Sequence, residues 1–290
     1  MTRLRPDWTV TNGSAGTMTF ANEVRAVRLR TSPGLAAELV DYLHDPGSSA
    51  PSFDLVRVLA ALEGQGVLTA DKPQLDSRCD RTFEYFACFV ADPARKLALL
   101  GRAHVLILGL GGTGSVVLQH LVAAGVGSFT LVDSDEVEAS NLNRQFIYTL
   151  RDVDRAKVDV CAEYVRARSP FARCATSLAR IGEAADLDPL VGSAHPPDVV
   201  LVAIDQPIES IIHTVTQRLA QTHTPYIVAG VGVRYGSVGE VTVGATDSRS
   251  FSATTAALST TNAISASYAA HAIVEWLTGS SLAFEMRRHA

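Results

Sequence analysis

Residues 104–133, HVLILGLGGTGSVVLQHLVAAGVGSFTLVD, decide the fold of most of this chain. They begin with a continuous apolar run, typical of a strand buried on both faces of a parallel sheet. A glycine-rich turn and an apolar helical stretch follow, and a second buried strand ends at Asp133. Strand, turn, helix and strand in this order predict a βαβ unit.

The same alternation continues downstream and predicts an α/β fold with a doubly wound, mostly parallel sheet. Apolar runs and helical periodicity mark the elements. We expect strands at 104–108, 129–132, 199–202, 226–229 and 238–243, and helices that include 116–124, 157–166 and 263–277.

Residues 1–75 follow a different pattern, which predicts a small winged-helix domain. Short strands separated by turn residues come first, then two helices and a last strand. The strands are expected at 8–11, 17–20, 24–29 and 67–69, and the helix caps at Ser32 and Ser52. A polar linker at about 70–80 then divides the chain into domains of residues 1–75 and 76–290.

Composition excludes several classes of protein. The net charge of −5 lacks the positive excess that nucleic-acid binding requires. No apolar run reaches the length of a membrane span and the first residues form no signal core, so we expect a cytoplasmic protein without membrane contact. The cysteines Cys79, Cys88, Cys161 and Cys174 form no C-x-x-C pair, which predicts buried, reduced thiols and no zinc site.

The glycine-rich turn is the first candidate for chemistry. Its glycines leave backbone amides bare at a helix N-terminus, where phosphate oxygens bind. These glycines are Gly109, Gly111, Gly112 and Gly114. Asp133, at the end of the next strand, is placed to accept hydrogen bonds from ribose hydroxyls. This fingerprint alone suits a nicotinamide dehydrogenase as well as an ATP-dependent enzyme.

The residues that follow narrow the choice. Residues 133–145 read DSDEVEASNLNRQ, and Lys157 stands thirteen positions after Arg144. Here the sequence resembles the superfamily of ThiF, MoeB and the ubiquitin-activating enzymes, over roughly residues 78–279. The resemblance implies a Rossmann-like adenylating domain in which Asp135 and Asn141 help to bind ATP. Arg144 and Lys157 supply positive charge against the triphosphate.

Two more candidates come from this resemblance. Asp205 follows a buried strand and matches the magnesium-binding aspartate of the superfamily, and magnesium needs only one or two carboxylates beside phosphate oxygens. The run Arg78–Arg81 resembles a motif whose second arginine reaches the ATP of a partner subunit. Arg81 is therefore expected to act catalytically with Arg144, Lys157 and Asp205, in a homodimer.

The family pattern breaks at the crossover loop, expected at about 245–260. Many members carry a thioester-forming cysteine there, whereas this chain has no cysteine after Cys174. The small residues of the loop suit a flexible lid over the substrate.

The first domain resembles the PqqD-like domain that binds leader peptides, in which the peptide adds as a strand to a sheet edge. Together the two resemblances imply ATP- and magnesium-dependent adenylation of a carboxylate on a ribosomally made precursor peptide, with release of pyrophosphate. With both domains the chain is similar to the peptide-modifying members of the superfamily, which mature microcin C7 and pantocin. The alternatives are a leader-binding partner protein, an activator of a sulfur-carrier protein, a dehydratase acting on tRNA, and a transcription regulator with a DNA-binding winged helix.

Overall fold

The computed structural model describes residues 2–13, 16–46, 50–70, 72, 77–206, 210–247 and 258–282. By its contacts the chain divides into two compact units, one up to Leu97 and the other from Ala98 to Ser280. This division falls later than the boundary expected near residue 75, because the helix α3 (Asp80–Ala87) belongs with the first unit. Residues 71 and 73–76 of the linker expected at 70–80, and residues 248–257 of the expected crossover loop, lie outside the described residues. No helix in the described part of the chain combines the length and apolarity that a bilayer crossing requires.

The first unit holds an antiparallel sheet and a helix pair. The strands β2 (Thr9–Asn12), β3 (Thr17–Ala21) and β4 (Ala26–Arg30) pair in that order. The helices are α1 (Pro33–His44) and α2 (Phe53–Gly64). Both predicted caps are confirmed, since the hydroxyls of Ser32 and Ser52 accept hydrogen bonds from the third amide beyond each.

A separate strand pair joins distant parts of this unit. The expected last strand, β5 (Leu68–Ala70), pairs antiparallel with β1 (Thr2–Leu4), which the sequence did not reveal.

The unit has its own core, built from alternate residues of β3 and the inner faces of both helices. Its buried members are Trp8, Met18, Phe20, Leu39, Leu55, Leu59, Leu62, Val67 and Leu68. The short helical turn η1 (Ser77–Cys79) and α3 follow it in the chain.

The second unit is an α/β domain around a six-stranded sheet of order β11-β10-β9-β6-β7-β8. All neighbouring pairs are parallel except β10 with β11. The strands are β6 (His104–Leu108), β7 (Ser128–Asp133), β8 (Arg173–Leu178), β9 (Val199–Val202), β10 (Tyr226–Val231) and β11 (Gly236–Val238). The predicted doubly wound α/β class is confirmed for this unit.

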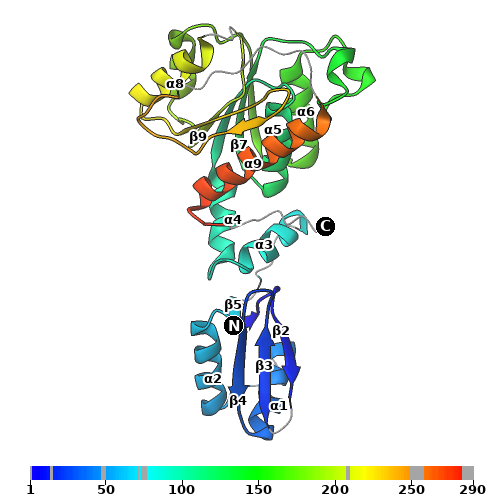
Figure 1. The fold of residues 1–290 in the computed structure, drawn as a ribbon, viewed down its shortest axis with the longest axis vertical. Coiled ribbons are helices and arrows are strands. Elements are labelled where there is room, and N and C mark those ends of the chain that lie inside the picture. Colours follow the sequence, from blue (N-terminus) through cyan, green and yellow to red (C-terminus); the bar gives the residue numbers. More distant parts are fainter. Residues whose placement is uncertain are drawn as a thin grey trace. The chain divides into compact units, whose positions relative to one another are not determined.

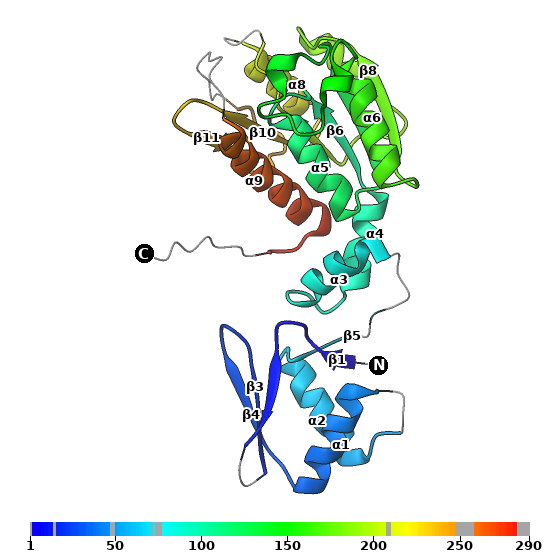
Figure 2. The same cartoon turned by 90° about the vertical axis from the view of Figure 1, so that its right-hand side faces the viewer.

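Helices cover both faces of the sheet, as Figure 1 shows, with α8 on one side and α5, α6 and α9 on the other. The main helices are α4 (Pro93–Arg102), α5 (Gly114–Ala124), α6 (Lys157–Arg168), α7 (Asp188–Val191), α8 (Ile211–Gln221) and α9 (Ser259–Thr278). Short turns of 3-10 helix lie at η2 (Ala139–Asn141), η3 (Leu150–Asp152) and η4 (Ala184–Leu187). Figure 2 shows α9 lying along α5.

Two strands differ from the expectation. The strand expected at 238–243 is instead β11, which begins at Gly236, runs antiparallel to β10, and leaves only an isolated bridge at Thr242. A tight turn explains the shift, because the Gly232 amide donates to the Tyr235 carbonyl and turns the chain back at once. The strand β8 was not expected, since at the sheet edge it carries few buried side chains.

The order of the strands places the candidate site. From β6 the chain proceeds to β7 and β8 on one side, and then to β9 and β10 on the other. Parallel sheets of this kind bind ligands in the crevice outside the carboxyl ends of the strands where the order reverses. That point lies between β6 and β9.

Candidate functional site

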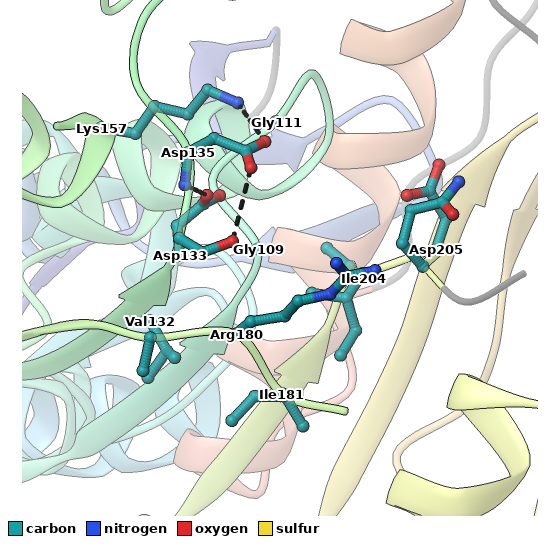
Figure 3. A pocket seen from close by; sticks show the side chains of 14 residues that line it. Gly109, Gly111, Val132, Asp133, Asp135, Lys157, Arg180, Ile181, Ile204 and Asp205 are labelled. Atoms are coloured by element: carbon teal, nitrogen blue, oxygen red, sulfur yellow. Dashed lines mark hydrogen bonds and ion pairs between the residues drawn. The ribbon is translucent and has the colours of Figure 1, made fainter. Parts of the chain in front are cut away.

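A cavity of about 260 Å³ opens at this point, outside the carboxyl ends of four strands. Figure 3 shows the side chains that line it. Its walls come from the segments that follow β6, β7, β8 and β9, together with the first residue of α6. The lining residues are Gly109, Gly111, Val132, Asp133, Ser134, Asp135, Lys157, Ala179, Arg180, Ile181, Ala203, Ile204, Asp205 and Gln206.

The glycine turn is shaped by close backbone packing. Gly109 has a φ of 91°, and a Cβ there would lie 2.5 Å from the carbonyl oxygen of Ala203. A Cβ on Gly114 would lie 1.8 Å from the carbonyl oxygen of Gly109. Only glycine fits at either position, so the turn stays tight and brings the N-terminus of α5 against the ends of the strands.

Asp133 ties the glycine turn to the next strand. Its carboxylate accepts a hydrogen bond from the Leu110 amide at 2.6 Å and another from the Asp135 amide at 2.8 Å. Burial raises the pKa of Asp133 above its ordinary value, while these two amides and Lys157 act in the opposite direction. The carboxylate therefore shapes the cavity and also presents acceptor oxygens to it.

Lys157 is a buried cation at the start of α6. Its ammonium donates to the Asp135 carboxylate at 2.9 Å, and its backbone amide donates to the Asp135 carbonyl at 3.0 Å. The Lys157 side chain is 7% exposed, whereas that of Asp135 is 64% exposed. Figure 3 shows this pair beside Asp133 at one end of the cavity. A desolvated ammonium in this position attracts phosphate oxygens strongly.

Asp205 lies across the cavity, just after β9. Among the described residues its carboxylate has no hydrogen bond or ion pair, so its oxygens are available to a cation. Magnesium binds proteins through one or two carboxylates together with phosphate oxygens and water. The residues present therefore fit a magnesium ion that a bound triphosphate brings with it.

Several predicted site residues do not line the cavity. Gly112 lies within the turn and Gly114 begins α5. The Arg144 side chain donates to the carbonyl of Ser140 at 3.0 Å and to the side chain of Asn143 at 2.8 Å. Asn141 is buried, and its side chain accepts a hydrogen bond from the Glu138 amide. Asn141 thus holds the turn that carries Arg144. Arg81 is exposed on α3, in the first unit.

Two features of the site were missed from the sequence. Arg180 enters the cavity from the segment after β8, and the unrecognised strand is the reason that it was overlooked. The second is a contact behind the turn, where the buried Tyr148 hydroxyl donates to the Leu110 carbonyl at 2.8 Å. The only sign of this contact in the sequence was a tyrosine three residues after Gln145.

Two of the four cysteines, Cys161 and Cys174, are placed as unreactive thiols. None of the four forms a disulfide, but only Cys161 is buried, and the other three are half-buried, which corrects the expectation of four buried thiols. Cys174 is half-exposed because it lies on the edge strand β8. Burial raises the pKa of Cys161 to about 12 and that of Cys174 to about 11. Both thiols stay protonated near neutral pH and are poor nucleophiles.

Known proteins resemble this chain in sequence and in structure. Residues 89–289 match the ThiF family. A sulfur carrier protein adenylyltransferase of Thermus thermophilus is 49% identical over 74 residues, which are 26% of this chain and 27% of that protein. The chain thus aligns with only about a quarter of this curated relative.

Solved structures match nearly the whole chain. Escherichia coli MccB with AMPCPP and MccA has a TM-score of 0.72 at 20% identity and is matched over 96% of this chain and 89% of that one. PaaA has a TM-score of 0.72 at 22% identity, over 94% and 91%. At these identities the matches establish the fold.

Proposed function

The chain belongs to the ThiF family, and we propose that it is an enzyme that uses ATP and magnesium to adenylate a carboxylate of a ribosomally made precursor peptide. One observation carries the proposal. A glycine turn at a helix N-terminus, a buried lysine, a pair of aspartates and a third aspartate across from them line a single cavity at the switch point of the sheet. A dehydrogenase needs no buried cation of this kind, whereas a triphosphate does.

The residues of the site have different roles in the proposed reaction. The peptide carboxylate attacks the α-phosphorus of ATP, an acyl adenylate forms, and pyrophosphate leaves. Lys157 and Arg144 stabilise the departing charge, Asp133 holds the ribose, and the amides beside Gly111 face the phosphates. Asp205 would hold magnesium, which neutralises charge on the triphosphate. Positioning and charge neutralisation therefore supply the catalysis.

The reaction has a direct signature. ATP–pyrophosphate exchange should require both the peptide encoded beside the gene and magnesium. Exchange measures the reversal of adenylate formation, and the adenylate forms only when both are present. Exchange is measured with labelled pyrophosphate, with and without peptide and chelator. Exchange at the same rate without peptide would contradict a peptide substrate. Efficient exchange with a sulfur-carrier protein instead would favour the second candidate function, which the Thermus relative supports.

We also propose that the first unit is a winged-helix, PqqD-like domain that captures the peptide by its leader. The outer edge of β4 pairs with no strand among the described residues. Figure 1 shows α2 running beside β4, and the Arg25 side chain before β4 donates to the Gln65 carbonyl at the end of α2. An extended peptide can complete the hydrogen bonds of such an edge.

The chemistry of this surface indicates the kind of leader. On α2, Phe53 is 78% exposed and Val56 is 49% exposed, one turn apart on the same face. On β4, the side chains of Arg28 and Arg30 are exposed and make no ion pair or hydrogen bond with a described residue. Exposed apolar side chains on α2, together with guanidinium groups on the outer face of β4, suit a leader that combines apolar and acidic residues. MccB, whose structures include one with MccA, supports a peptide partner by its shared fold.

Phe53→Ser should weaken peptide binding to the full-length protein about tenfold, because a large exposed apolar side chain is lost from the docking face. The rate of adenylation at saturating peptide should not change, since the substitution is remote from the chemistry. Calorimetry and exchange kinetics measure the two effects. Phe171→Ser, at a phenylalanine that is 83% exposed on the other unit, is the control. Equal peptide affinity in both variants, or binding of duplex DNA alone at physiological salt, would contradict capture at this surface.

A further inference from the structure

The cavity has two chemically different ends. One end is polar, with the glycine turn, Asp133 and the ion pair of Lys157 with Asp135. The other part of the lining is apolar, because Ile181 after β8 and Ile204 after β9 both pack in the hydrophobic cluster that α8 contributes to. Triphosphate oxygens belong at the polar end, and the flat face of a nucleobase suits the apolar end.

Arg180 lies at the apolar end. In Figure 3 its side chain extends from the segment after β8 toward the side of Ile204 and Asp205, on the opposite side of Asp133 from Lys157. Although it is exposed, its guanidinium makes no ion pair or hydrogen bond with any described residue, and it does not pair with Asp205. No interaction with a described residue therefore accounts for the place of Arg180 in the lining beside Ile181 and Ile204.

The topology supports the same division. Phosphates bind after β6, and Asp133 at the end of β7 is placed for the ribose. β8 is the next strand in the sheet beyond β7, about 5 Å further from β6. A nucleotide that runs from phosphate through ribose to base along this line brings its base to the segment that contains Arg180.

We propose that Arg180 is the nucleobase platform of the ATP site, whose planar guanidinium stacks on the adenine ring. A guanidinium group stacks well on aromatic faces because it is flat, delocalised and weakly hydrated. An ammonium group cannot do the same. This inference rests on the proposed function, because it names the group that the same cavity binds at its apolar end.

The test separates the base from the phosphates. Arg180→Ala should weaken the binding of ATP by about tenfold and leave the binding of inorganic tripolyphosphate unchanged, since stacking on a base contributes about 1–3 kcal/mol in nucleic-acid complexes. Arg180→Lys should lose most of the same affinity although it keeps the charge. Arg166→Ala, at an exposed arginine of α6 that does not line the cavity, is the matched control. Titration calorimetry of the full-length wild type and the three variants measures the affinity of each for ATP and for tripolyphosphate.

Each other result has a definite meaning. Equal losses for ATP and tripolyphosphate would place Arg180 on the phosphates and overturn the inference, as would unchanged ATP affinity in Arg180→Ala. Melting curves should coincide, because no described residue depends on this side chain. If the wild-type protein binds tripolyphosphate and binds ATP no more tightly, the base platform alone is overturned. Wild-type protein that binds neither would overturn the proposed function and this inference with it.

Discussion

Asp205→Ala is expected to reduce peptide-dependent pyrophosphate release at least about a hundredfold, which corresponds to ~3 kcal/mol on the barrier. The carboxylate lies just after β9, faces the cavity, and has no partner among the described residues. Its loss therefore removes a ligand for magnesium without leaving a buried group unpaired. The melting temperature should stay close to that of the wild type.

The magnesium dependence makes this result specific. Asp205→Asn should need a higher magnesium concentration for half-maximal release, because a neutral amide oxygen is a weaker ligand for a hard cation. Asp159→Ala, at an exposed carboxylate of α6 outside the cavity, controls for a change in surface charge. Near-normal release by Asp205→Ala at every magnesium concentration would remove the metal role from this residue.

A mixture of two inactive proteins is expected to recover activity if the enzyme is a homodimer whose subunits share arginines. Arg81→Ala and Lys157→Ala should each be inactive alone. In a heterodimer, one cavity keeps its own Lys157 and receives Arg81 from the partner, so about half of the wild-type activity should return. If Arg81 acts within its own subunit, both cavities keep one defect and nothing returns.

Differently tagged subunits, co-expressed and purified by both tags, give the required heterodimers. Light scattering confirms their stoichiometry, and pyrophosphate release reports activity per dimer. Recovery near half of the wild-type rate would support sharing across the interface. Inactive but verified heterodimers, or a monomeric wild-type protein, would contradict it.

The parts of the site that follow strong strands were predictable from the sequence. Gly109 directly follows β6, Asp133 ends β7 and Asp205 lies three residues after β9, and the apolar runs of these strands are readily recognised. Because parallel strands finish at one edge of the sheet, these residues had to meet there. The helix caps were equally predictable from the sequence, because Ser32 and Ser52 act through local hydrogen bonds.

The parts that depend on partners distant in sequence were not predictable. β8 has an alternating, mostly exposed pattern because it is an edge strand, so neither it nor Arg180 stood out. β1 has three residues and exists because it pairs with β5. The shift of β11 came from a turn hydrogen bond between Gly232 and Tyr235, which apolar periodicity does not report. The roles of Arg81, Arg144 and Asn141 stay predictions.

Oxygen tracing tests the adenylation of a peptide carboxylate most directly. The precursor peptide is prepared with its carboxyl groups labelled with oxygen-18 and incubated with the enzyme, ATP and magnesium, and the released nucleotide is weighed. If the carboxylate attacks the α-phosphorus, the adenylate carries one labelled bridging oxygen, and its capture by a nucleophile at the acyl carbon yields AMP with one oxygen-18 and unlabelled pyrophosphate. Release of ADP with labelled phosphate would show attack at the γ-phosphorus instead, and unlabelled AMP would show that the carboxylate does not attack at all.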